Sequence, residues 1–220
     1  MSAQPTETIE DYLAAIYVME RDGEPIVPAK LARILGVAPP TVTVTLQRMQ
    51  RDHWLSAKGD HLTEEGLLAA QAVVRRHMLA EWMLSRYLKI PLASLHEEAH
   101  RLEHAISGEI EKNLALQLEN PEQCPHGNPL PGHEESVSGW RPLTASKAGE
   151  RITIRRLHER AEDNREILDY LVSQGVVPGT SVRVTDVSAV NETVSLLRGN
   201  THVVLGFSTA RHVFGEVEAA

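Results

Sequence analysis

The sequence predicts a mainly α-helical protein with a small β-barrel at its C-terminus. Apolar residues recur at helical spacing through most of residues 7–119, whereas beyond Gly149 short runs alternate apolar and polar residues as strands do. Proline, glycine, asparagine and serine dominate residues 124–142, between the two patterns. The 220 residues exceed one domain of usual size, so we expect two or three compact units.

Helix start and stop signals divide the N-terminal half of the chain. Pro28 and the pair Pro39-Pro40 suit the first position of a helix, and Thr63 suits an N-cap. Pro91 prevents the fourth helix from continuing. We therefore expect helices at about residues 7–22, 28–36, 39–52, 63–88 and 94–119.

Strand signals are short and lie in two places. Residues 54–62 contain the turn Lys58-Gly59-Asp60 and predict a small hairpin. Further strands are expected beyond Gly149, with one helix at about residues 164–173 among them. Short strands in this arrangement indicate a small barrel. The expected strands cover residues 152–154, 181–184, 194–197 and 202–205.

The second and third helices form a candidate helix-turn-helix. This motif requires a small residue where the helices cross, a glycine in the turn and an apolar anchor in the second helix. Ala32, Gly36 and Val42 have these offsets. The hairpin that follows would be a wing, so the sequence predicts a winged helix-turn-helix. On spacing alone, a generic three-helix cluster with solvated polar faces is the alternative.

The outward face of the third helix suits duplex DNA. The whole chain has a net charge of −8, but residues 25–59 carry five basic residues against the lone acid Asp52. Thr41 and Thr43 would enter the major groove, whereas Arg48 and Arg51 would neutralise phosphates. The predicted DNA-binding residues are Pro40, Thr41, Thr43, Val44, Gln47, Arg48, Arg51 and Lys58.

Histidines and carboxylates recur at helical spacing in the middle of the chain. Four potential ligands would share one stripe of the fifth helix, and two more are one turn apart on the fourth. Imidazole and carboxylate together suit a borderline divalent ion, and histidine is a poor choice for a merely solvated face. The sequence therefore favours a metal site. The six candidates are His77, Glu81, His96, His100, Glu103 and His104.

Three further metal candidates are weaker. Asp11 lies on the first helix, and Cys124 and His126 form a Cys-x-His pair in the segment CPHGNP. A lone cysteine is more often an inert core residue. The neighbouring histidine and prolines make a metal ligand about as well supported as an inert core residue, so both interpretations stand for Cys124.

Several classes of protein are disfavoured by composition. A single cysteine cannot build a disulfide framework and suits a reducing compartment. No apolar run approaches the ~18–20 residues that span a bilayer. The acidic, polar start of the chain differs from a secretory signal. We expect a cytoplasmic protein with no membrane partner and no small-molecule substrate.

Five segments resemble the diphtheria toxin repressor family of iron- and manganese-dependent transcriptional regulators. The resemblance implies a homodimeric repressor that binds operator DNA when loaded with Fe(II) or Mn(II). It also implies an N-terminal DNA-binding domain (residues 1–73), a helical metal-binding and dimerisation domain (74–140), a linker (141–149) and an SH3-like, FeoA-like barrel (150–220). The segments are TIEDYLAAIY (8–17), PPTVTVTLQRM (39–49), RRHMLAEWML (75–84), LHEEAHRLEHAIS (95–107) and CPHGNPLPG (124–132).

The resemblance also implies two groups of ligands. One joins the first helix to the fifth, and manganese-dependent relatives add the CPHG segment to the other. Carboxylates of the barrel sometimes complete the second group, and Asp163 and Glu166 are the candidates here. The first group is Asp11, His100, Glu103 and His104; the second is His77, Glu81, His96, Cys124 and His126.

Two departures from the family pattern bear on the metal. Iron regulators tend to have a thioether where this chain has Asp11, and the hard carboxylate favours Mn(II), with Fe(II) the second choice. Manganese regulators tend to have a glutamate at the position of His100 and an acid at Ala14. An imidazole bridges metals less readily than a carboxylate, which argues against a bridged two-metal centre.

Two other classes of function compete with a repressor. Glu97-x-x-His100 resembles half of a di-iron carboxylate site, so a helical-bundle enzyme or a metal hydrolase is conceivable. A di-iron bundle needs a second Glu-x-x-His, however, and the basic helix-turn-helix would be unexplained. A metal-dependent adaptor that uses the barrel without binding DNA is the other alternative. It predicts no salt-dependent binding to duplex DNA.

Overall fold

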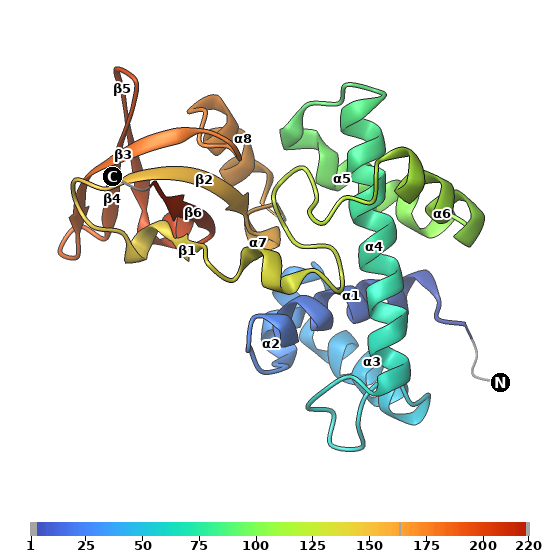
Figure 1. The fold of residues 1–220 in the computed structure, drawn as a ribbon. Helices are drawn as coiled ribbons and strands as arrows, with labels where there is room; N and C mark the ends of the chain where they lie inside the picture. The colour runs from blue at the N-terminus through green and yellow to red at the C-terminus, as the bar shows by residue number, and fades with distance from the viewer. Residues whose placement is uncertain (1–3, 163, 219–220) are drawn as a thin grey trace. The chain divides into compact units, whose positions relative to one another are not determined.

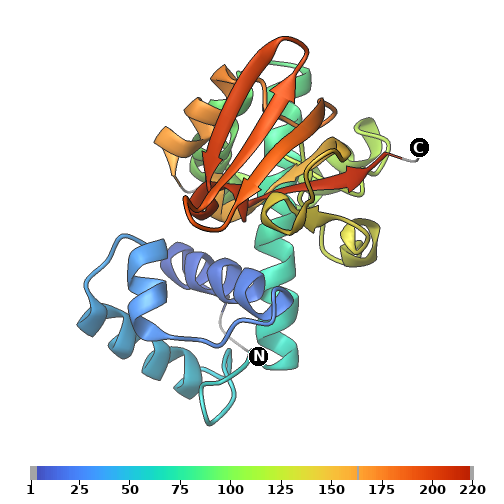
Figure 2. The ribbon, with the colours of Figure 1, turned by 90° about the vertical axis from the view of Figure 1, so that its left-hand side faces the viewer.

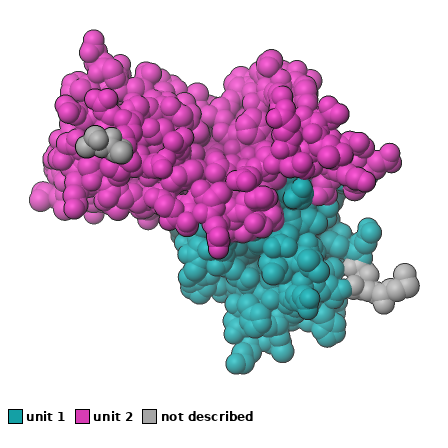
Figure 3. Space-filling model, viewed as in Figure 1, with its two compact units in different colours: residues 1–77, 102–107 teal, residues 78–101, 108–220 magenta. Residues whose placement is uncertain are grey.

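The computed structural model describes residues 4–162 and 164–218, which form two compact units. Unit 1 comprises residues 1–77 and 102–107, and unit 2 comprises residues 78–101 and 108–220 (Figure 3). The chain therefore passes from unit 1 to unit 2, returns for six residues, and leaves again. Helices come first in the chain and the sheet comes last (Figure 1).

Unit 1 is built from helices whose limits lie close to the predicted ones. They are α1 (Glu7–Arg21), α2 (Pro28–Ile34), α3 (Pro39–Arg51) and the first part of α4 (Glu64–Arg86). Proline occupies the start of α2 and of α3, as expected from its fixed φ and missing N–H. The core of this unit contains the fully buried residues Leu13, Ile16, Leu31, Val42 and Met49.

The hairpin predicted after α3 is smaller than expected. In the described chain it has one isolated bridge, between Leu55 and Leu62, and no strand of two or more residues. A bond from the Ser56 N–H to the His61 carbonyl (2.9 Å) is part of that bridge. We call residues 54–62 the wing loop.

The helix predicted over residues 94–119 is broken in the structure. It consists of α5 (Leu92–Leu102), a 3₁₀ turn η1 (Glu103–Ala105) and α6 (Gly108–Gln117). Ile106 is extended (φ −78°, ψ 109°) and buried, and this ends the turn. Glu103 and His104 are therefore not on the α-helical stripe that the spacing predicted. The prediction failed because periodicity alone does not detect a one-turn change of helix type.

The C-terminal part of unit 2 is an antiparallel sheet of six strands in the order β1-β6-β2-β3-β4-β5 (Figures 1 and 2). The prediction of a closed barrel is wrong, because β1 and β5 are the two edges of the described sheet and do not pair. The strands are β1 (Arg141–Pro142), β2 (Arg151–Leu157), β3 (Ser181–Ser188), β4 (Thr193–Arg198), β5 (Thr201–Gly206) and β6 (Val213–Val217).

Alternation of side chains along the strands builds the core of this sheet. Ile152, Ile154, Val182 and Val184 are fully buried, and the residues between them are exposed or half-buried. Residues 141–149, expected to be a linker, instead contribute β1, the turn η3 (Leu143–Ala145) and the buried side chain of Leu143. The remaining helices of the sheet region are α7 (Glu159–Glu162), α8 (Arg165–Ser173) and α9 (Phe207–Ala210).

The segment between α6 and the sheet is an ordered loop with its own buried residues. It contains the 3₁₀ turn η2 (Glu134–Val137). Cys124, His126, Asn128 and Leu130 are each at most 3% exposed. No helix in the described part of the chain has the length and apolarity that crossing a membrane requires.

Candidate metal centres and nucleic-acid interface

The outward face of α3 is exposed as predicted. Val42 and Met49 anchor the helix in the core at 0% exposure, and Leu46 is half-buried. Val44, by contrast, is 66% exposed. All eight predicted DNA-binding residues are exposed: Pro40, Thr41, Thr43, Val44, Gln47, Arg48, Arg51 and Lys58.

Charges on this face are arranged around the end of α3. Arg48 and Arg51 both lie near the carboxylate of Asp52, at 3.4 Å and 3.2 Å. Exposed ion pairs of this kind are weak, so phosphates can replace Asp52 at small cost. The Thr43 hydroxyl donates to the Pro39 carbonyl (3.2 Å), which holds that side chain against the first turn.

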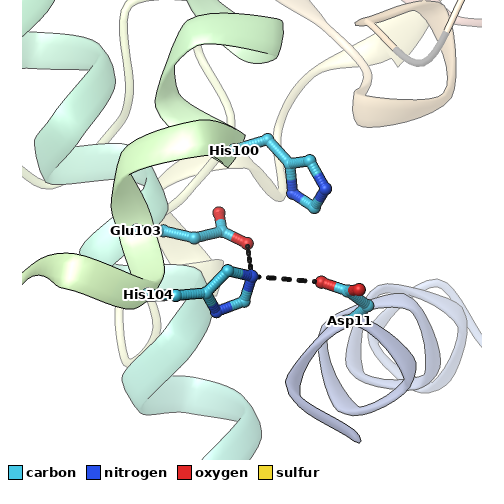
Figure 4. Close-up of side chains that lie close together, drawn as sticks. All are labelled: Asp11, His100, Glu103 and His104. Carbon is cyan, nitrogen blue, oxygen red and sulfur yellow. Dashed lines mark ion pairs between the residues drawn. The ribbon is translucent and has the colours of Figure 1, made fainter. Parts of the chain in front are cut away.

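A cluster of possible metal ligands lies within unit 1. The imidazole of His104 lies between the carboxylates of Asp11, on α1, and Glu103, on η1 (Figure 4). Its Nε2 is 3.3 Å from Asp11 Oδ1 and 3.4 Å from Glu103 Oε1. We call these three residues the first cluster. Their ligand atoms all lie within 4.8 Å of one another.

Glu10 determines which nitrogen of His104 faces that cluster. Glu10 Oε2 is 2.6 Å from His104 Nδ1, and its other oxygen accepts from Arg76 (2.6 Å). Glu10 contacts Nδ1, so Nε2 is the nitrogen that faces the two other carboxylates. A cation between Nε2 and these two carboxylates would bind all three donor atoms. A carboxylate behind a ligating histidine is the usual outer partner in metal sites.

A histidine of α4, His77, contacts the first cluster within unit 1. His77 Nδ1 is 2.5 Å from Glu103 Oε2, so Glu103 contacts one histidine with each oxygen. Glu103 is 4% exposed, and this burial makes its charge costly without such partners. His100, also labelled in Figure 4, lies on α5 three residues before Glu103 and belongs to unit 2. Its part in the first cluster is a proposal taken up below.

A second cluster lies within unit 2 and is more deeply buried. It comprises Glu81 on α4, His96 on α5, Cys124 and His126 in the loop, and Glu162 on α7. The ligand atoms of Glu81, His96 and Glu162 lie within 4.8 Å of one another, as do those of Glu81, Cys124 and His126. His96 Nδ1 is 3.2 Å from Glu162 Oε2. His77, one turn before Glu81 on α4, belongs to unit 1.

His126 is oriented as a ligand by a backbone carbonyl. Its Nε2 is 3.0 Å from the Leu92 carbonyl, which can only accept, so Nε2 carries the hydrogen. Nδ1 then faces Glu81 Oε1 at 3.0 Å and Glu162 Oε1 at 3.6 Å. Burial alone would lower the pKa of His126, but the carboxylates of Glu162 and Glu81 raise it to about 9. A proton therefore occupies Nδ1 at neutral pH when no metal is bound.

Burial also changes the acids of the second cluster. It raises the pKa of the Cys124 thiol well above its usual range, and the nearby charges of Glu81 and Glu162 add to that effect. Burial raises the pKa of Glu162 too, although His126 and His96 oppose the rise. Removing the desolvation cost of these acids requires positive charge. A divalent cation would supply it and would favour the thiolate of Cys124.

The donor sets of both clusters fit a divalent metal. The first offers carboxylate oxygens and one imidazole nitrogen. The second offers two carboxylates, two imidazoles and a thiol, most of them inaccessible to water. Hard oxygen ligands suit Mn(II), and the mixed set accepts Fe(II) and other borderline ions as well.

The carboxylate that the structure brings to the second cluster from the sheet region is Glu162, which is neither of the two candidates named from sequence. Asp163 lies outside the described residues. Glu166 is exposed at the start of α8 and belongs to none of the clusters among the described residues. Glu162, one turn before it, faces His96 and His126 instead. No sequence signal separated Glu162 from its acidic neighbours, because α7 has only four residues.

The Glu97-x-x-His100 pattern is not part of a di-iron centre. Glu97 is 57% exposed at its side chain and pairs with Arg101 and with Arg165 (3.5 Å). A carboxylate that lies on the surface and pairs with two arginines does not supply the inward ligand that a helical-bundle oxidase requires.

Comparison with known families covers most of the chain in three segments. Residues 5–61 match the family described as "Iron dependent repressor, N-terminal DNA binding domain". Residues 63–132 match "Iron dependent repressor, metal binding and dimerisation domain". Residues 141–217 match "FeoA domain".

Relatives and solved structures agree with these matches. The chain is 35% identical to the iron-dependent repressor IdeR of Mycobacterium tuberculosis, over 94% of this chain and 96% of that protein. It is 31% identical to the diphtheria toxin repressor of Corynebacterium diphtheriae, over 82% and 85%. A manganese-dependent transcriptional repressor in complex with manganese superposes with a TM-score of 0.81 at 26% identity, over 96% of this chain and all of the other. ScaR with bound Zn²⁺ gives 0.79 at 27% identity, over 96% and 99%.

Proposed function

This chain belongs to the iron-dependent repressor family that includes the diphtheria toxin repressor, and we propose that it represses its genes as an Mn(II)-loaded homodimer bound to operator DNA. Its relatives and structural neighbours are metal-dependent transcriptional repressors and not enzymes. Both iron and manganese occur in their names. Fe(II) is the second choice of metal, and genes of metal homeostasis are the proposed targets.

One observation carries this proposal: His104 Nε2 lies within 3.4 Å of two carboxylates from different segments of unit 1. Without a cation, Asp11 and Glu103 repel each other across that point. A bound divalent ion reverses the sign of the interaction and joins α1 to η1. His100 would complete this first cluster and His77 the second.

The position of η1 in the chain gives this junction its consequence. Residues 102–107 belong to unit 1, and the chain on both sides of them belongs to unit 2. An ion that fixes Asp11 to Glu103 and His104 therefore restrains the connection through which the DNA-binding helices meet the rest of the protein. We propose that this restraint selects the arrangement in which the two α3 helices of a dimer fit successive major grooves.

The preference for Mn(II) rests on the chemistry of the first cluster. Asp11 supplies a hard carboxylate oxygen, and the cluster has no sulfur ligand among the described residues. Such a set discriminates less against Mn(II) than a thioether or thiolate set does. The proposal also places the protein in the cytoplasm, where its DNA target lies.

Gel retardation of DNA upstream of the metal-transport genes tests the proposal directly. Mn(II), Fe(II) and a chelator are compared at fixed ionic strength. Retardation should appear with the metal, disappear with the chelator and weaken steeply with added salt. Metal-independent retardation, or none with either ion, would contradict a metal-activated repressor.

Two variants separate metal sensing from DNA contact. His104→Ala should abolish metal-dependent retardation because the first cluster loses its central nitrogen. Arg48→Ala should weaken retardation for all sequences and lower the salt slope by about 0.9, the value for one phosphate contact. Metal binding by the protein should not change. Reduced metal binding by Arg48→Ala would show that this variant disturbs more than the DNA-binding face.

A further inference from the structure

The wing loop has little backbone pairing of its own. Its strand-like pairing in the described chain is the Leu55–Leu62 bridge, which is made by two bonds: Ser56 N–H to the His61 carbonyl (2.9 Å) and Thr63 N–H to the Trp54 carbonyl (3.1 Å). An isolated two-stranded hairpin is at best marginally stable in water, and this one is shorter still. Contacts with the rest of unit 1 must therefore hold Lys58, at its tip, in place.

Glu20 provides one of these contacts from the C-terminal end of α1. Its Oε1 accepts the backbone N–H of Leu62 at 2.6 Å, across 42 positions in the sequence. Leu62 is 7% exposed, so its amide has little access to water. Burial raises the pKa of Glu20, whereas the Leu62 bond and nearby His61 lower it, and Asp60 raises it. The hydrogen bond from the Leu62 N–H therefore offsets part of the cost of burying the Glu20 carboxylate.

Gln50 provides a second contact, from the last turn of α3. Its Nε2 donates to the Ala57 carbonyl at 3.1 Å. Gly59 has φ +71°, and a Cβ there would come within 2.8 Å of the Gln50 amide, so the loop turns tightly against that side chain. Lys58 lies between Ala57 and Gly59 and is exposed. The wing loop is thus attached at Ala57 to α3 and at Leu62 to α1.

We propose that Glu20 is a positioning residue for DNA binding, which holds the wing loop, and with it Lys58, on the same helix that carries Asp11. This inference rests on the proposed function. Glu20 follows Asp11 by nine residues, about 13 Å along one continuous helix. A metal that restrains α1 through Asp11 therefore also restrains the wing loop through Glu20.

A double-mutant cycle on operator DNA tests the proposal. Lys58→Ala should weaken metal-dependent binding severalfold and lower the salt slope by about 0.9, the value for one phosphate contact. Glu20→Ala should do the same although it removes a negative charge, because it releases Lys58. In the double variant the second substitution should cost almost nothing. Additive losses would overturn the proposal.

Two comparison variants exclude simpler explanations. Glu20→Gln keeps an oxygen that accepts the Leu62 N–H, so it should restore binding and the salt slope. Glu64→Ala removes an exposed carboxylate two residues beyond Leu62 and should not weaken binding. A loss in Glu20→Gln equal to that in Glu20→Ala would show that the charge, and not the hydrogen bond, matters.

Amide hydrogen exchange keeps this inference separate from the proposed function. In DNA-free protein, Glu20→Ala should accelerate exchange at Leu62 while the α1 amides near Asp11 remain protected. Unchanged exchange at Leu62 would overturn the role of Glu20 even if the protein proves to be a repressor. Failure of the wild-type protein to bind operator DNA would overturn the proposed function and leave the measured Glu20–Leu62 contact standing.

Discussion

The two candidate metal clusters differ in depth and in how many parts of the chain build them. The first uses α1 and η1, and its Asp11 side chain is 31% exposed. The second uses α4, α5, the loop at 124–128 and α7, and Glu81 and His126 in it are inaccessible to water. The first cluster thus lies where two segments meet near the surface, and the second lies in the buried interior of unit 2.

Because the two clusters differ in this way, we expect a bound ion to have a different effect at each. At the first cluster a metal would join α1 to η1, so removal of the metal should weaken that junction. At the second, the buried carboxylates need a positive charge whether or not metal is present, and the proton on His126 supplies part of it. We therefore expect the first cluster to govern DNA binding and the second to govern attachment of the sheet.

Removing one ligand from each cluster should give the largest effects and separate the two roles. Glu162→Ala is expected to weaken metal binding at the second cluster by at least ~100-fold, because losing a ligand costs more than losing a residue that only orients a ligand. His104→Ala should have the same effect on the first cluster instead. Calorimetric titration with Mn(II) measures both.

Glu166→Ala is the matched control for that experiment, since it removes an exposed carboxylate one turn away. It should leave both clusters at wild-type affinity. If Glu166→Ala, and not Glu162→Ala, reduced the binding at the second cluster, the assignment of the carboxylate from the sheet region would be reversed.

An outer contact of the second cluster should have the next largest effect. Asn128 is fully buried; its amide group donates to Glu162 and to the Leu157 carbonyl (2.8 Å), and its oxygen accepts from Arg156 (2.5 Å). Arg156 can only donate, so the Asn128 oxygen must face it and the NH₂ must face Glu162. Asn128→Asp places a carboxylate against Glu162 and should weaken metal binding there by ~10–100-fold.

The control for this change is Asn113→Asp, on the exposed side chain of α6 that donates to the Glu109 carbonyl. It should alter neither cluster. Thermal unfolding of both metal-free variants shows whether Asn128→Asp loses the fold, and an Asn128→Asp protein that binds metal normally would contradict the role of this amide.

Metal affinity at the second cluster should also depend on pH. His126 has a pKa of about 9 in the metal-free protein, so an ion that binds its Nδ1 at pH 7 must displace a proton. Affinity at the second cluster should therefore rise about tenfold per pH unit between 7 and 8 for each proton released: one from His126, and a second if Cys124 binds as the thiolate. Titrations in buffers of different ionisation enthalpy count the released protons, and a pH-independent affinity would contradict their release.

The same raised pKa sets the sign of a stability effect. The folded pKa of His126 lies above its unfolded value of 6.5, so its stabilising contribution is complete below pH 6.5 and is lost as pH rises through about 9. Metal-free protein should become less stable over that interval for this reason, and metal-loaded protein should not. Denaturant unfolding at several pH values measures the difference.

The smallest change is expected from the outer contact of the first cluster. Glu10→Ala removes the acceptor that orients His104, and water can substitute in part because both side chains keep 15% exposure, so the loss of metal affinity should be about tenfold at most. Glu7→Ala, on an exposed residue of the same helix, is the control. An equal loss in both variants would indicate a general effect of charge on α1.

Local sequence signals determined the helices, the exposed face of α3 and most of the candidate ligands. Proline at helix starts and apolar spacing act over a few residues, so α1 to α4 lie near their predicted limits. The ligand types were likewise visible as imidazoles and carboxylates one turn apart. The broken helix after Leu102 and the open sheet were not visible, because each depends on packing between distant segments.

Tertiary structure alone decided which polar atoms face each other. Glu162, Asn128 and Leu92 meet His126 or its neighbours only because the loop at 124–128 lies against β2, where Gly127 (φ +87°) leaves no room for a Cβ beside the Arg155 carbonyl. Glu20 reaches Leu62 across 42 positions for the same kind of reason. Composition and spacing specify which atoms can bind a cation, but the orientation of a lone pair is set by whichever donor or acceptor the fold places behind it.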